Sequence, residues 1–236
     1  SKMGYWIDLS NPYVTYEPKY METVWWLIKT ISEKGLLYKG YTVQPYSPAA
    51  GSGLSSHELN QPGAYKQVSD TSIIAQFKCT KDNTSAKFNS FYPFYFLAWT
   101  TTPWTIPSNT ALTVGADIEY SFIKTFNQYT KEKITVVLAS SLIEKVFDKK
   151  FFIVEHKEKL EAFKESDSQI PYYVISKCKG IDIENLRYER VWDESPLPID
   201  NPENAFRVIL GDFVTTEDGT GIVHTAPTFG ADDYKA

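Results

Sequence analysis

Apolar residues recur every three or four positions over residues 17–34, and this spacing predicts an amphipathic helix. Its apolar positions are Met21, Val24, Trp25, Ile28 and Ile31. Pro18 suits the first helical turn and Gly35 suits the C-terminal cap. The adjacent Trp25 and Trp26 either pack on the body of the same chain or mark a surface for a neighbour.

From residue 41 onward, the apolar positions change to short runs separated by turn residues. Their enrichment in Val, Ile, Tyr and Phe predicts strands. The predicted strands are 41–46, 73–79, 91–99, 120–126, 133–138, 151–155, 172–176, 206–210 and one near 221–224. A short helix is expected at 140–148, capped by Ser140 or Ser141. Many short strands with few helices predict an α+β fold, a β-rich barrel or sandwich with peripheral helices.

The composition narrows the function classes. Of 236 residues, 42% are hydrophobic and 22% charged, which predicts a folded chain. The net charge is −5, and no long basic run occurs, so any nucleic-acid contact is expected to be local, since duplex binders usually show a basic face. No run of about 20 apolar residues and no leader occurs, so neither a membrane span nor secretion is expected. Cys79 and Cys178 are expected to be ordinary buried thiols.

Residues 99–109 read WTTTPWTIPSN and follow a predicted apolar strand. Pro103 and Pro107 fix the backbone φ angle at two places, which favours a stiff turn. Its hydroxyls and carboxamide are suited to orienting a water molecule, a ribose hydroxyl or an ester carbonyl. The alternative is structural: residues 100–102 continue the strand, and Asn109 closes a turn through bonds to the backbone.

Residues 217–233 join a glycine-rich turn, a short apolar strand and a helix start with which the sequence ends, as if cut from a larger protein. His224 lies on this strand, where a histidine is often structural. Asp232 and Asp233 stand at the helix start, where one can cap the helix and the other favour its dipole. Consecutive helical residues point in different directions, so at most one serves a site, and a single buried carboxylate suits an ammonium group. No zinc or phosphate-loop motif occurs, and no metal is expected.

Together the two stretches resemble the signature peptides of the editing domains of isoleucyl-, valyl- and leucyl-tRNA synthetases. Residues 99–109 resemble the threonine-rich peptide, and residues 219–233 resemble the second peptide. His224 followed by Thr-Ala-Pro points to the isoleucyl member. Residues 4–8 and 20–26 are similar to the part that leads from the catalytic core into the insertion, so the resemblance covers nearly the whole chain.

The resemblance implies a β-barrel-like editing domain at 41–236, and a helical segment at 1–40 that links it to a catalytic core absent here. The implied reaction is hydrolysis of the ester that joins valine to the terminal adenosine of an isoleucine tRNA. No cofactor is expected for it, because ATP serves only the absent core. The implied partners are the valine-carrying 3′ end of that tRNA and the rest of the synthetase chain, in the cytoplasm; the isolated domain is expected to be monomeric.

The resemblance also implies roles for single residues. Asp233 is expected to bind the α-ammonium group, and His224 to line the amino-acid pocket and exclude isoleucine. The residues expected to position the ester, the ribose or the water are Thr102, Thr105 and Asn109. Those expected to contact the adenosine are Thr100 and Thr101.

Two alternatives stay open beside this interpretation. The first is a non-catalytic module that binds the tRNA acceptor end, and the second is an editing domain of the valyl or leucyl member. Thr228 and Phe229 depart from the glycine and histidine of many bacterial members, and residues 47–56 lack the cysteines of a zinc knuckle; both features suggest a eukaryotic cytosolic type.

Overall fold

The computed structural model describes residues 4, 8, 10–81, 87–192, 194 and 201–236. The chain forms two compact units, Ser1–Thr42 and Val43–Ala236. The expected linking motif at 4–8 falls mostly outside the described residues. The assignment of residues 1–40 and 41–236 to a linking segment and an editing domain stays a prediction.

The first unit contains helix α1 (Pro18–Glu33), which begins at its proline as predicted. Its end is set by Gly35, whose φ of +69° favours glycine and whose N–H donates to the carbonyl of Ser32 at 2.9 Å. Within this unit no residue of α1 is buried. The apolar face with Trp25 and Trp26 therefore finds no core here, and what covers it stays a prediction.

The second unit contains most of the chain's secondary structure. Its strands are β1 (Tyr46–Ser47), β2 (Ser52–Gly53), β3 (Ile73–Lys78), β4 (Tyr95–Thr100), β5 (Ala111–Val114), β6 (Glu119–Phe126), β7 (Lys133–Ala139), β8 (Phe151–Ile153), β9 (Ile170–Lys179), β10 (Arg207–Leu210) and β11 (Ile222–Thr225). Its α-helices are α2 (Ser56–Leu59), α3 (Ile143–Phe147), α4 (Gly180–Ile183) and α5 (Ala231–Lys235). The 3-10 helices are η1 (Asn89–Phe91), η2 (Pro103–Ser108), η3 (Ser140–Leu142), η4 (Asp148–Lys150), η5 (Lys157–Ala162) and η6 (Pro202–Asn204).

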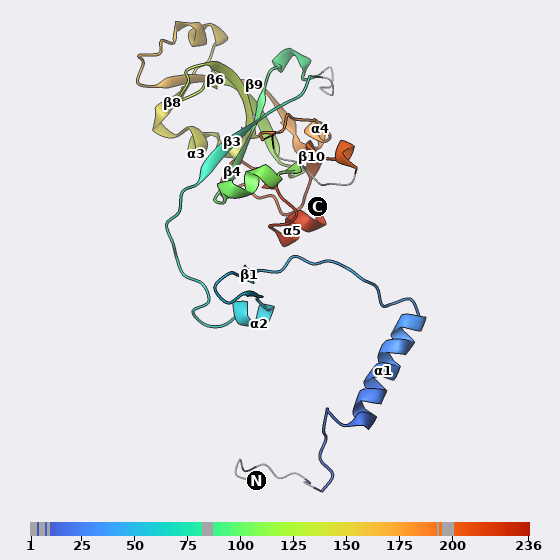
Figure 1. The fold of residues 1–236 in the computed structure, drawn as a ribbon. Helices are drawn as coiled ribbons and strands as arrows, with labels where there is room; N and C mark the ends of the chain where they lie inside the picture. Colours follow the sequence, from blue (N-terminus) through green and yellow to red (C-terminus); the bar gives the residue numbers. More distant parts are fainter. Residues whose placement is uncertain (1–3, 5–7, 9, 82–86, 193, 195–200) are drawn as a thin grey trace. The chain divides into compact units, whose positions relative to one another are not determined.

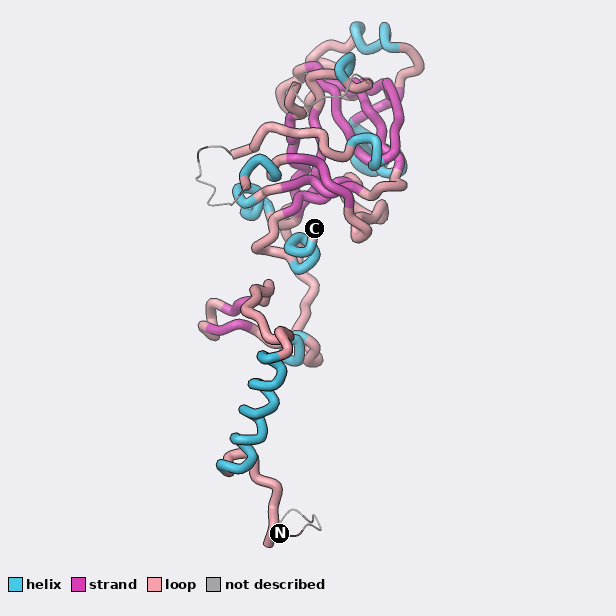
Figure 2. The backbone as a smooth tube through the Cα atoms, turned by 90° about the vertical axis from the view of Figure 1, so that its right-hand side faces the viewer, coloured by secondary structure: helices cyan, strands magenta, loops and turns pink. Residues whose placement is uncertain are grey.

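Nine strands form one mixed sheet, in the order β10-β5-β11-β4-β7-β6-β9-β8, with β3 also paired to β4 (Figure 1). Short helices lie at the margins of the sheet (Figure 2). This arrangement confirms the α+β class. Between β10 and β8, the strands at the two ends of the order, the described residues make no pairing, so no closed barrel is found.

Strand β4 is the branch point of this sheet. One edge pairs with β3 along its length. The other edge is divided: Tyr95 and Phe96 lie opposite β7, whereas Trp99 lies opposite Val223 of β11. The division places the end of β4, where the threonine-rich stretch begins, beside β11.

The core beneath the sheet is aromatic. The ring of Phe122 lies 5.0 Å from that of Phe88 and 5.1 Å from that of Phe94, and all three side chains are fully buried. Aromatic pairs at these separations are favourable beyond the area that they bury. This packing holds the strands from which the polar residues project.

Two predictions of local structure were wrong, and one strand was missed. Of the strand expected at 41–46, only the last residue is in a strand, because residues 41–45 find no sheet partner. Neither Ser140 nor Ser141 caps α3; the N-cap is Leu142, and the Ser140 hydroxyl instead bonds that of Ser121 at 2.7 Å. Strand β5 was missed, because all four of its residues are buried and no polar alternation marks it.

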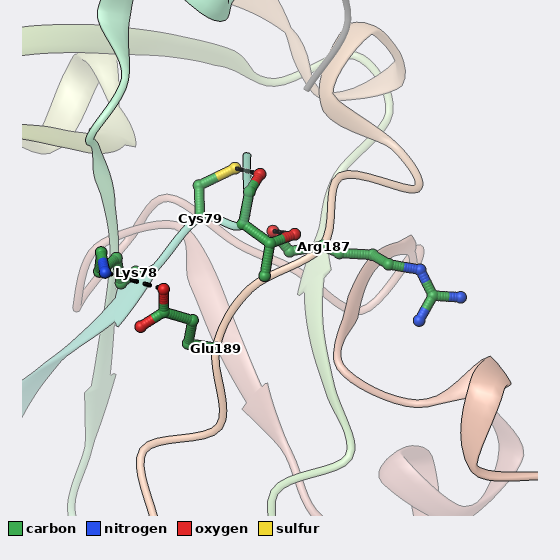
Figure 3. Close-up of polar contacts among 5 residues, drawn as sticks. Lys78, Cys79, Arg187 and Glu189 are labelled. Carbon is green, nitrogen blue, oxygen red and sulfur yellow. Dashed lines mark hydrogen bonds and ion pairs between the residues drawn. The ribbon is translucent and has the colours of Figure 1, made fainter. Parts of the chain in front are cut away.

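Residues 187–189 add an irregular partner to the end of β3 (Figure 3). The N–H of Thr80 donates to the Arg187 carbonyl at 2.8 Å, and the N–H of Glu189 donates to the Lys78 carbonyl at 2.7 Å. The Lys78 ammonium also lies 2.8 Å from the Glu189 carboxylate. The residue between these ties, Tyr188, is thereby fixed opposite the end of β3.

Candidate functional site

The two stretches singled out in the sequence meet at the branch point. Strand β4 ends at Thr100, and η2 with its two prolines carries the chain to Asn109 and into β5. Strand β11 lies between β4 and β5, with His224 opposite Leu112. Side chains more than a hundred residues apart in the sequence therefore share one place.

Three threonine hydroxyls form a chain along the turn. The Oγ1 atoms of Thr100 and Thr102 lie 3.3 Å apart, and those of Thr102 and Thr105 lie 3.4 Å apart. The Thr105 hydroxyl donates to the Thr102 carbonyl at 2.8 Å. Thr100 and Thr105 are buried, whereas Thr101 and Thr102 are exposed. Of these three hydroxyls, that of Thr102 is thus the one that can reach a ligand.

The Asn109 carboxamide is buried, and its orientation is fixed. Its Nδ2 lies 2.8 Å from the Ala111 carbonyl, which can only accept, and its Oδ1 accepts from the Tyr188 hydroxyl at 2.6 Å. The remaining N–H therefore points at Nδ1 of His224, 2.8 Å away. Asn109 does close the turn, as in the structural alternative, but it also orients the histidine.

This arrangement determines the tautomer of His224. Because Nδ1 faces a donor, the ring proton must lie on Nε2, which is 3.0 Å from Thr105 Oγ1. That hydroxyl already donates to a carbonyl, so it must accept here. Two independent constraints thus select the Nε2–H form.

His224 is neutral at pH 7. Burial lowers its pKa from the ordinary 6.5, and the nearby charge of Asp233 only partly opposes this. A second proton would lie on Nδ1 and face the Asn109 N–H. Both ring nitrogens are therefore occupied by internal hydrogen bonds, which fix the orientation of the ring.

The lowered pKa predicts a pH-dependent stability. Below pH 6.5 the unfolded chain binds a proton at His224 that the folded chain resists, so the free energy of unfolding should fall by up to about 1 kcal/mol from pH 7.5 to 5.5. Replacing His224 with glutamine should remove this part of the slope, measured by urea unfolding at both pH values. The same change at the exposed His57 is the matched control and should keep the wild-type slope.

The pH range in which His224 changes the stability is separate from the range in which the carboxylates do so. The Lys177 ammonium holds the pKa of Glu119 below 4.5, so the stability from this pair is present above that pH and is lost only as the pH falls further. An equal slope in wild type and His224→Gln between pH 7.5 and 5.5 would contradict the assignment.

Asp233 turns inward from α5, whereas Asp232 is exposed. The Asp233 carboxylate accepts from the N–H of Ala226 at 3.0 Å. Neither aspartate caps the helix, since the N-cap Gly230 has no side chain and no side-chain cap bond is made. Asp233 also lines a cavity of about 260 Å³, together with Thr110, Ala111, Asn201, Asn204, Ala205, Arg207, Ile209, Thr225, Pro227 and Ala236. Of the two aspartates, this one can meet a ligand.

His224 thus bonds to both Thr105 and Asn109, and Thr100 and Thr102 are joined to Thr105 through their hydroxyls. Asp233 reaches the cluster only through its charge on His224. Tyr188 is the member that sequence analysis missed, because nothing near it in the sequence resembles a motif.

Within the described residues, no three His, Cys, Asp or Glu side chains gather closely enough to hold a metal ion. None of the helices in the described part of the chain is long and apolar enough to cross a membrane. Both cysteines are buried, as expected.

Comparison with known proteins places this site in a family. A model described as tRNA synthetases class I (I, L, M and V) matches residues 1–193. The isoleucine--tRNA ligase of Bacteroides fragilis is 56% identical over 235 residues, which are 99% of this chain and 20% of that protein. That of Treponema denticola is 42% identical over 251 residues, covering 100% of this chain and 21% of the relative. The chain spans about a fifth of the length of these relatives.

Among solved structures, the P. knowlesi cytosolic leucyl-tRNA synthetase editing domain is similar with a TM-score of 0.44 and 14% identity, covering 69% of this chain and 60% of that one.

The prediction of a eukaryotic cytosolic type finds no support, because relatives at 53–56% identity are bacterial. It rested on the absence of cysteines at 47–56 and on Thr228 and Phe229. These two residues are exposed, and exposed loop positions tolerate change. The family match over residues 1–193 is stronger evidence about this chain than those two loop positions are. The chain belongs to the class I tRNA synthetases of the I, L, M and V group.

Proposed function

We propose that this chain is an editing domain that hydrolyses valine from a mischarged isoleucine tRNA. The observation that carries the proposal is the hydrogen-bonded cluster of Thr105, Asn109 and His224, which the two signature peptides build together. The similarity to isoleucine--tRNA ligases over nearly the whole chain supports the choice of tRNA.

In this proposal Asp233 holds the substrate. Its carboxylate is half-buried and borders a cavity, and an ammonium–carboxylate hydrogen bond is among the stronger polar contacts in water. The exposed Thr102 hydroxyl, at the end of the hydroxyl chain, contacts the ester or the ribose. Thr100 and Thr101 contribute to the adenosine site at the end of β4.

Water is the nucleophile, and no side chain of the cluster is free to act as its base. His224 cannot take its proton without breaking the hydrogen bond from Asn109. Water adds to the ester carbonyl, the bond between the carbonyl carbon and the ribose oxygen breaks, and the proton of the water passes through the neighbouring ribose hydroxyl or solvent to that leaving oxygen. The protein contributes fixed dipoles around the ester carbonyl. Ester hydrolysis needs no ATP and no metal, so the domain uses no cofactor.

Selectivity comes from the wall formed by His224 and Thr105. Both are buried, and each is fixed by two hydrogen bonds, so the wall does not yield to a larger side chain. A second site is needed because one methylene changes binding by only about 10- to 200-fold, a limit for which isoleucine–valine discrimination by this enzyme family is the standard example. Valine enters the second site, and isoleucine is excluded.

The partners follow from the charge. With a net charge of −5, the chain would hold only the 3′ end of the tRNA, while the rest of the synthetase holds the remainder. The reaction belongs to protein synthesis in the cytoplasm, and the domain is proposed to act as a monomer within its synthetase.

The test is deacylation of isoleucine tRNA carrying valine, with the same tRNA carrying isoleucine as the control. Faster release of valine than of isoleucine supports the proposal. Binding of the 3′ end without release favours an acceptor-end binding module. Release from mischarged valine or leucine tRNA, with none from isoleucine tRNA, favours an editing domain of the valyl or leucyl member.

A further inference from the structure

Tyr188 lies outside both signature stretches, yet it is 2% exposed and firmly anchored. Its neighbours Arg187 and Glu189 are tied to the end of β3 (Figure 3). Its own N–H donates to the Phe206 carbonyl at 3.1 Å, and its ring packs edge-on against Phe77 at 5.4 Å. A side chain held on both sides in this way has one available position for its hydroxyl.

That hydroxyl begins a directed series of donations. The series runs from Tyr188 to Asn109 Oδ1, from Asn109 Nδ2 to His224 Nδ1, from His224 Nε2 to Thr105 Oγ1, and from Thr105 to the Thr102 carbonyl. Tyr188, His224 and Thr105 each have one donor in the series, and Asn109 uses its second N–H on the Ala111 carbonyl. A change at the first donor can therefore be passed on to the last.

We propose that Tyr188 is a positioning residue: by holding Oδ1 of Asn109, it keeps His224 in the Nε2–H form and the Thr105 hydroxyl turned towards the backbone. The role in selectivity rests on the proposed function, because it assumes that His224 and Thr105 line the amino-acid pocket. The tautomer itself does not depend on that assumption.

The physical reason lies in the symmetry of the carboxamide. Turned by 180°, the Asn109 amide would present Oδ1 to His224 and select the Nδ1–H form. The Thr105 hydroxyl would then donate to Nε2 and leave the Thr102 carbonyl. Three groups oppose this turn: the Ala111 carbonyl at 2.8 Å, the more distant Thr225 carbonyl at 3.4 Å and the Tyr188 hydroxyl. Without the Tyr188 hydroxyl, only the amide nitrogen of Asn109 keeps hydrogen-bond partners that fix its orientation.

The test is Tyr188→Phe, which keeps the ring between its aromatic neighbours and removes the hydroxyl. The tautomer of His224 is read from the ¹⁵N shifts of its two ring nitrogens. The wild type should show the Nε2–H form alone, and Tyr188→Phe should gain a share of the Nδ1–H form. The titration midpoint of His224 should rise in the variant. Asp233, whose charge acts on the ring, is the same in both proteins.

Tyr120→Phe is the matched control. Tyr120 is fully buried; its hydroxyl donates to the Gly221 carbonyl at 2.7 Å and accepts from the Gly115 N–H at 3.1 Å. Its removal should cost at least as much stability as that of the Tyr188 hydroxyl and leave the His224 tautomer as in the wild type. If Tyr188 had only a structural role, both variants would lose stability and neither would change the tautomer of His224.

Activity gives a second readout. Tyr188→Phe should lower kcat/KM for valine release roughly three- to tenfold and narrow the preference for valine over isoleucine. An Nδ1–H form in the wild type, or an unchanged tautomer in Tyr188→Phe, would overturn the inference even if valine is released. Absence of valine release by the wild type would instead refute the proposed function, and the ¹⁵N result would still decide the role of Tyr188.

Discussion

Replacing Asp233 with asparagine is expected to lower kcat/KM for valine release about 10- to 150-fold. Charge-assisted hydrogen bonds contribute about 1.5–3 kcal/mol, and each 1.36 kcal/mol is tenfold in rate. The amide oxygen of asparagine can still accept from the N–H of Ala226, so the loop between β11 and α5 should keep its geometry. The loss would then measure the carboxylate charge and not a displaced loop. Single-turnover deacylation of valine-charged isoleucine tRNA gives the rate.

The adjacent aspartate supplies the control. Asp232 has the same charge on the same helix but is exposed, so Asp232→Asn should stay within about twofold of the wild type. Asp233→Ala adds a structural cost, because it leaves the buried Ala226 without its acceptor, at about 1–3 kcal/mol of stability. Equal rates for the wild type and Asp233→Asn would refute ammonium binding by this residue.

Much of the sheet could be predicted because its strands carry the residues that strands favour. Strands β6 and β7 were predicted to within one residue at each end, since β6 is rich in Phe, Tyr and Ile and β7 in Val and Ile. Strand β5 could not be, because an Ala-Leu-Thr-Val run with every side chain buried has no alternation. Its place between β10 and β11 is a tertiary fact, visible only once the sheet is assembled.

The meeting of the two peptides was inferred from resemblance, and residue chemistry alone left each one structural. The structure shows why neither could be judged separately. His224 is held by Asn109 and Thr105, 115 and 119 residues away respectively, and no local pattern encodes such bonds. Tyr188 adds a third segment, brought in by its backbone ties to β3.

Asn109 was predicted to position substrate, but its carboxamide is 4% exposed and all its hydrogen bonds are internal. Its effect on catalysis is therefore expected to pass through His224. Whether it also touches substrate stays a prediction. The largest effect on stability is therefore expected from a change at Asn109, and the largest effect on rate from a change at Asp233.

Asn109→Ala is expected to lower the free energy of unfolding by about 3–5 kcal/mol, measured by urea unfolding at pH 7.5. Three buried groups lose a partner, and each unsatisfied buried group costs about 1–3 kcal/mol. These groups are the Ala111 carbonyl, His224 Nδ1 and the Tyr188 hydroxyl. Asn89→Ala, at an exposed position, should change stability by less than about 0.5 kcal/mol.

Asn109→Asp tests the same network with the opposite sign of pH dependence. At neutral pH a carboxylate oxygen would face two acceptors, the Ala111 carbonyl and His224 Nδ1, so the variant should be destabilised. Protonation of His224 relieves one of these contacts and forms an ion pair, which raises the folded-state pKa of the ring above 6.5. The stability of this variant should therefore be greater at pH 5.5 than at 7.5, whereas the wild type shows the reverse. If the stability of Asn109→Asp depended on pH as that of the wild type does, the Asn109 amide would not face Nδ1 of His224. The assignment of the Nε2–H tautomer to His224 would then be wrong.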